Sequence, residues 1–118
     1  DKDDNKNGDV TIGQLNKTTW ASLAKINTFM NDFPAYDGEI DNHTITNASG
    51  VDMLVFFDYA CEQSEYDEYA AKLEAAGFEK TPASSLSAIY KKTSTKRLSI
   101  SMSYSAGNLA ISVSSEAL

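Results

Sequence analysis

The sequence of 118 residues contains a single cysteine, Cys61, and a single histidine, His43. One cysteine excludes an internal disulfide. The chain also lacks a phosphate-binding glycine loop and any pair of cysteine or histidine ligands at metal-binding spacing. The sequence therefore offers no convincing catalytic constellation, and we expect that the protein is not an enzyme.

Long apolar runs and basic clusters are missing as well. The apolar run 53–57 is far shorter than the roughly 20 residues that a membrane-spanning helix needs. The net charge is −7, and basic residues adjoin only at 91–92 and 96–97. Because nucleic acids and anionic membranes attract basic surfaces, we expect neither as a partner. The chain has no signal peptide and does not begin with Met, so we expect a mature or trimmed form.

The segment from Val51 to Phe78 organises the predicted fold. Residues 53–57 have the length of a buried strand and are apolar on both faces, so we expect an interior strand packed on both sides. A helix is predicted from about Ser64, where residues 64–67 resemble a capping box, to Gly77, a residue type that favours a helix end. Its apolar face consists of Tyr66, Tyr69, Ala70, Leu73 and Ala76.

The remaining elements complete an α+β pattern. A first helix is predicted from Thr18 or Thr19 to Asp32, before Pro34, and a strand from 39 to 46. Four short strands follow Gly77, at 78–81, 87–93, 97–104 and 109–114. We predict a two-layer sandwich of order α-β-β-α-β-β-β-β, with two helices packed on one mostly antiparallel twisted sheet of about five to six strands. This packing leaves Leu54 and Phe56 on the second face, where either the 34–38 turn and aromatic residues of the tail cover them or they mark an interface. This single domain would span 18–115, preceded by a polar N-terminal tether, 1–17.

Residues 3–14 allow a second interpretation besides a plain tether. They carry oxygen-bearing side chains at the positions of a calcium loop, with Gly8 in the sixth place. The segment resembles a single EF-hand or dockerin-type loop, although Gln14 stands where a bidentate carboxylate is expected. Calcium is the one cofactor that the sequence suggests, and it would stabilise a structural or scaffold domain. The predicted ligands are Asp3, Asn5, Asn7, Asp9 and Gln14.

Tyrosines and serines supply the candidate contact residues. Six tyrosines are many for this length, and an exposed cluster of them would suit carbohydrate or peptide recognition. From Leu98 to Tyr104, large apolar residues alternate with serines, which predicts one buried face and one serine face. That face is either an ordinary wet sheet surface or a flat binding surface. The predicted ligand-binding residues are Tyr36, Tyr66, Tyr69, Ser99, Ser101 and Ser103.

Cys61 and His43 leave one enzymatic alternative, a thiol hydrolase. Acidic residues follow Cys61 at the start of the predicted helix, and their charges should raise the pKa of the thiol and oppose its activation. We therefore expect a structural cysteine.

Motifs between residues 33 and 113 resemble a group of small uncharacterised domains in bacterial secreted proteins and lipoproteins. The pattern is P-x-Y-x-G at 34–38, Y-x-x-x-L-x-x-x-G-F at 69–78 and Y-x-K at 90–92, followed by a hydrophobic hairpin. The resemblance implies export, often on a lipid-anchored cysteine followed by a polar tether, and brings no known activity. We therefore expect a secreted or lipid-anchored, extracytoplasmic binding module at the cell surface or in the periplasm. Its expected partner is an unknown protein or carbohydrate of the cell envelope.

Overall fold

The computed structural model describes residues 17–118. Its elements are β1 (Thr18–Thr19), α2 (Trp20–Ile26), the 3-10 helix η1 (Thr28–Asp32), β2 (Glu39–Ile40), β3 (Asn42–Ala48), β4 (Val51–Asp58), α3 (Gln63–Ala75), β5 (Glu79–Ser84), β6 (Ser87–Thr93), β7 (Lys96–Ser105) and β8 (Asn108–Ala117). Strands β3 to β8 form one six-stranded sheet in the order β3-β4-β8-β7-β6-β5, and β1 pairs with β2 in a separate two-stranded sheet. All pairings are antiparallel, so the predicted α+β class with a mostly antiparallel sheet is confirmed.

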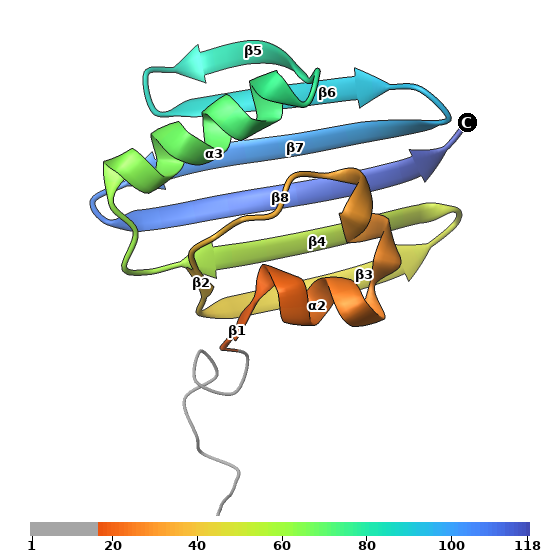
Figure 1. The fold of residues 1–118 in the computed structure, drawn as a ribbon, viewed down its shortest axis with the longest axis horizontal. Coiled ribbons are helices and arrows are strands. Elements are labelled where there is room, and N and C mark those ends of the chain that lie inside the picture. The colour runs from red at the N-terminus through yellow and green to blue at the C-terminus, as the bar shows by residue number, and fades with distance from the viewer. Residues whose placement is uncertain (1–16) are drawn as a thin grey trace, which may run out of the picture.

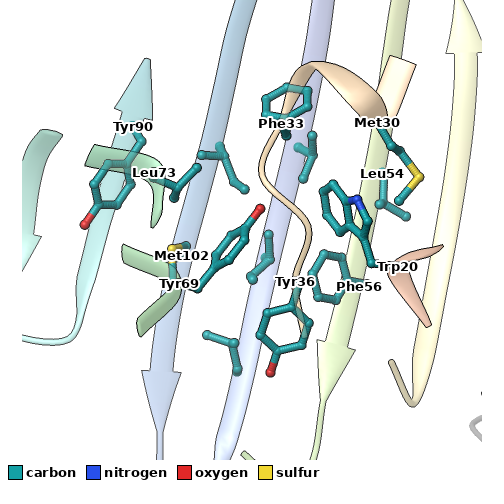
Figure 2. Packing of buried hydrophobic residues seen from close by; sticks show 14 of the residues in the cluster. Trp20, Met30, Phe33, Tyr36, Leu54, Phe56, Tyr69, Leu73, Tyr90 and Met102 are labelled. Atoms are coloured by element: carbon teal, nitrogen blue, oxygen red, sulfur yellow. The ribbon is translucent and has the colours of Figure 1, made fainter. Parts of the chain in front are cut away.

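The hydrophobic core lies between the large sheet and the helices. Figure 1 shows α2, η1 and α3 on the same side of the sheet. On that side Leu54 and Phe56 of β4 lie opposite Val113 and Ile111 of β8, and all four are buried. Trp20 of α2 packs edge-on against Phe56, with 6.0 Å between the ring centroids (Figure 2). Because successive residues of a strand point to opposite faces, the buried set on each strand marks the face that the helices cover.

The other side of the sheet, which we call the open face, is covered by no helix of the described residues. Its residues are half-buried or exposed, which corrects the expectation that β4 is packed on both sides. Both helices cover the side of Leu54 and Phe56 instead. The open face comprises Asn42, Thr44, Thr46 and Ala48 of β3, Val51, Met53, Val55 and Phe57 of β4, Asn108, Ala110, Ser112, Ser114 and Glu116 of β8, Arg97, Ser99, Ser101, Ser103 and Ser105 of β7, Ser87, Ile89, Lys91 and Thr93 of β6, and Glu79 and Thr81 of β5.

The first predicted helix is interrupted at Asn27. The chain forms α2, leaves helical geometry at Asn27 (φ −113°, ψ 82°) and continues as η1 to Asp32. The backbone N–H and the side-chain amide of Asn27 both donate to the carbonyl of Leu23, at 2.8 and 3.1 Å. An asparagine side chain competes in this way with helix continuation. The predicted cap at Thr19 is confirmed, because its hydroxyl accepts from the N–H of Ser22 at 3.3 Å.

Helix α3 starts and ends with defined caps. Its capping box uses Glu62 and Glu65, so the predicted box at Ser64 and Asp67 is wrong by two residues. The carboxylate of Glu65 accepts from the N–H of Glu62 at 2.8 Å, a role that glutamate fills better than the shorter aspartate. At the other end Gly77 adopts φ +94°, and the N–H of Phe78 donates to the carbonyl of Leu73 at 3.0 Å. The predicted Schellman ending is therefore confirmed.

Three strands differ from their predicted bounds. The predicted strand 39–46 is divided at Asp41, because β2 pairs with β1 while β3 pairs with β4. This division, with the extra strand β1, also changes the predicted element order. Strand β5 continues through Pro82, since an edge strand needs no N–H donor on its outer side, and its register shifts between Pro82 and Ser84. Strand β8 runs to Ala117, beyond the predicted end at 114.

Candidate functional site

A buried polar cluster lies where β4 ends. The hydroxyl of Tyr36 donates to Oδ2 of Asp58 at 2.5 Å, and Oδ1 of Asp58 accepts from the N–H of Ala60 at 3.1 Å. The same hydroxyl lies 3.7 Å from Sγ of Cys61. Asp58 is only 3% exposed, so these hydrogen bonds supply the partners that a buried carboxylate requires. Burial, and then the carboxylate of Asp58, raises the pKa of Tyr36 and keeps its hydroxyl protonated as a donor.

Gly38 permits the close approach of these groups. A Cβ atom at this position would lie 2.5 Å from the hydroxyl of Tyr36 and 2.7 Å from Oδ2 of Asp58. The P-x-Y-x-G turn thus places Tyr36 over the strand end and leaves room for the carboxylate. Beside the cluster is a small cavity of about 70 Å³. Its lining residues are Tyr36, Asp37, Gly38, Glu65, Glu68, Tyr69 and Lys72.

Three potential metal ligands also meet at this point. One ligand atom each of Asp58, Cys61 and Glu65 lies within 4.8 Å of the others. All three are already used by the fold: Glu65 accepts from the N–H of Glu62, Cys61 donates to the carbonyl of Glu62 at 3.3 Å, and Asp58 holds Tyr36. The cluster therefore joins the end of strand β4 to the start of helix α3, and both carboxylates and the thiol take part in hydrogen bonds of this junction.

The environment of Cys61 opposes nucleophilic chemistry. Burial raises the pKa of its thiol to about 11, and the carboxylates of Asp58 and Glu65 act in the same direction. The hydroxyl of Tyr36 acts in the opposite direction without reversing the shift. His43 lies on β3 opposite Phe56, and Cys61 follows the end of β4. The thiol is thus protonated at neutral pH and hydrogen-bonded inside the fold.

We expect Cys61 to react slowly with iodoacetamide in the folded protein. A thiol of pKa about 11 carries far less thiolate at pH 8 than one of the usual value near 8.5, so labelling should be about a hundredfold slower than in urea. Because the pKa is raised on folding, this thiol contributes stability below the unfolded pKa, and the contribution is lost as the pH rises toward 11. Labelling followed by mass spectrometry tests this, and equal rates in both states would contradict it.

The predicted tyrosine contacts are buried in the core. Tyr36, Tyr66 and Tyr69 are 4%, 5% and 2% exposed. Tyr69 donates to the carbonyl of Pro34 at 2.8 Å, and the ring of Tyr66 lies against Tyr104. The expectation of a tyrosine-bearing contact edge is therefore corrected: the helix faces the sheet through these rings, and amphipathic spacing marks them as core.

The predicted serine contacts lie together on the open face. Ser99, Ser101 and Ser103 of β7 lie opposite Ser114, Ser112 and Ala110 of β8. Across the sheet, the rows through Ser99 and Ser101 continue into larger residues on both sides, whereas the row through Ser103 continues into Ser87 on one side and Phe57 on the other. The central row runs Thr81, Ile89, Ser101, Ser112, Val55 and Thr44.

The open face carries exposed hydrophobic residues outside the predicted contact set. Met53 and Ile89 are each 38% exposed, and Tyr59, just after β4, is 50% exposed. The rings of Phe57 and Tyr59 stack, with centroids 5.9 Å apart and planes 16° apart. The alternation of Met53, Val55, Phe57 and Tyr59 is the sequence signal for this face, but the apolar residues on both sides of the strand predict burial of both sides.

The open face is electrically neutral in a strongly acidic chain. Its basic residues, Lys91 and Arg97, are matched by Glu79 and Glu116. Glu79 lies opposite Lys91, and Arg97 reaches Glu116 at 3.4 Å. All four lie in the two rows at one end of the strands, so the rest of the face is uncharged. The net charge of −7 is carried elsewhere in the chain.

The predicted calcium ligands, Asp3, Asn5, Asn7, Asp9 and Gln14, lie outside the described residues. None of the helices in residues 17–118 has the length and apolar character that a membrane span requires. No protein-family model, no curated protein and no solved structure matches the chain.

Proposed function

We propose that residues 18–115 form a non-enzymatic, extracytoplasmic binding module, built as a two-layer sandwich whose contacts are made by the open face. The observation that carries this proposal is a neutral sheet surface with exposed hydrophobic residues. Interfaces are depleted of charge at their centre and enriched in aromatic residues and methionine. Met53, Phe57 and Tyr59 fit this composition, Ile89 adds exposed apolar surface, and the serines beside them offer hydroxyl groups to a partner.

The buried cluster supports the non-enzymatic part of the proposal. A general base or nucleophile needs access to a substrate and a pKa suited to its task. Cys61 is 4% exposed with a raised pKa, and Asp58 is 3% exposed and bound to Tyr36. Export and envelope location rest on the resemblance of residues 33–113 to domains of secreted proteins.

The proposal is tested with two matched isoleucine variants. Ile89→Lys places a charge on the open face, and Ile26→Lys places the same charge on α2, where Ile26 is 82% exposed. We expect wild type and Ile26→Lys to bind at least one immobilised envelope glycan or purified envelope protein, and Ile89→Lys to bind at least about tenfold more weakly because a desolvated charge opposes contact.

The readout is surface plasmon resonance on panels of envelope glycans and proteins. Equal binding by both variants would exclude the open face as the contact surface. Absence of wild-type binding to every panel member would contradict the binding module itself.

A further inference from the structure

We propose that the open face pairs two copies of this chain face to face, about a two-fold axis that runs parallel to the strands between β7 and β8. The inference deepens the proposed function, because it names a second copy as a partner of the same face. The axis lies at the centre of the sheet, with β3, β4 and β8 on one side and β7, β6 and β5 on the other.

The area of the open face suits a dimer. The longest strands have ten residues. The six strands hold 48 residues in all; with strands about 4.8 Å apart and a rise of about 3.3 Å per residue, they cover roughly 760 Å² before side-chain relief is counted. A standard interface buries about 800 Å² on each partner, so the whole face would be needed and would suffice. Serine and alanine on β7 and β8 are small, which allows two sheets to pack at the usual separation of about 10 Å.

The proposed axis brings unlike strands together in a self-complementary way. It places β8 of one copy over β7 of the other and β4 over β6, as an isologous contact requires. Within the central row, Val55 then lies over Ile89 of the second copy, and Ser112 over Ser101. Val55 and Ile89 of the two copies thereby cover each other, Met53 lies over Lys91 of the second copy, and the serine rows meet at the centre.

The same axis matches the charges. Arg97 and Glu116 are cross-strand partners on β7 and β8, so the axis places Arg97 of each copy over Glu116 of the other. The pair is exposed within one chain, at 63% and 45%, and a second copy would add an opposite charge to each member. A neutral face also lets two acidic chains approach without the repulsion that their other surfaces would produce.

The test reverses the charge of Arg97 in one variant and the charge of Glu116 in another. Arg97→Glu alone and Glu116→Arg alone each place like charges across the axis and should weaken self-association at least about tenfold. An equimolar mixture of the two variants should recover wild-type association within about threefold, as a mixed dimer. The pair within each chain remains broken in the mixture, so recovery reports contact between chains. Analytical ultracentrifugation over a concentration series measures all four samples.

A second pair of variants tests the dimer without altering Arg97 or Glu116. Ala110→Arg lies on the open face and should weaken association, whereas Ala71→Arg on the exposed side of α3 should not. Thermal melts confirm that each variant is folded. A wild-type chain that stays monomeric to about 1 mM overturns the dimer, as does a mixture no more associated than either variant alone. If the dimer is overturned, a loss of envelope binding in Ile89→Lys would still support the proposed function. If the chain forms a charge-dependent dimer but binds no envelope ligand, the dimer stands and the proposed envelope binding fails.

Discussion

Replacing Phe56 with alanine is expected to lower the free energy of unfolding by about 3–5 kcal/mol, whereas the same change at Phe57 should cost about 1 kcal/mol. The two residues are adjacent on β4 and chemically identical. Phe56 has no exposed surface and contacts Trp20 and Tyr36, so its removal leaves a cavity in the core. Phe57 is on the open face and stacks only on Tyr59 among the described ring contacts.

Urea denaturation at equilibrium measures both variants, with equal dependence on denaturant as the control for two-state behaviour. At a protein concentration at which the chain is monomeric, similar losses at the two positions would show that both sides of β4 are covered within one chain. In that case the open face would not exist as a free surface, and the proposals based on it would fail together.

Replacing Asp58 with alanine is expected to cost about 2–3 kcal/mol of unfolding free energy. The hydroxyl of Tyr36 and the N–H of Ala60 would both lose a buried hydrogen-bond acceptor. The matched control is Asp37→Ala. Its carboxylate is 79% exposed and pairs with Lys72 at 2.7 Å, so its removal should cost less than about 1 kcal/mol.

A double-mutant cycle separates the hydrogen bond from the loss of the side chain. Tyr36→Phe removes the donor, so it should cost about 1 kcal/mol in wild type and little in the Asp58→Ala background. Chemical denaturation of the four proteins provides the coupling energy. Additive costs would mean that the two groups do not act as a unit, and the cluster would then not hold the turn on the strand.

Local signals in the sequence were sufficient for most elements. Strict alternation from Leu98 to Tyr104 predicted β7, and Gly77 with Phe78 predicted the end of α3, because each depends on neighbouring residues alone. Two predictions failed because a neighbouring side chain forms a competing hydrogen bond. Asn27 binds Leu23 and divides the first helix, and Glu62 forms the capping box in preference to Ser64.

The site was harder to predict because it depends on distant residues. The alternation of β4 separated Leu54 and Phe56 from Val55 and Phe57, but both sets are apolar, so only the placement of the helices decided which set is covered. Asp58 follows Leu54 and Phe56 at the same two-residue spacing, so it points to the same covered face, and this spacing is the one sequence signal for its burial. Its partner Tyr36 is 22 residues away and follows a turn, so the pairing required the fold.

The central position of β8 has a consequence for the order in which the sheet can form during synthesis. Strand β4 pairs with β8, which places Val51 opposite Glu116, and β7 holds the other side of β8. A nascent chain therefore cannot close its sheet until the residues up to Ala117 are available, and before then two half-sheets, β3-β4 and β5-β6-β7, remain apart. Folding that waits for such a late and distant pairing is slow. Residues 108–117 therefore supply the strand that joins the two halves of the sheet.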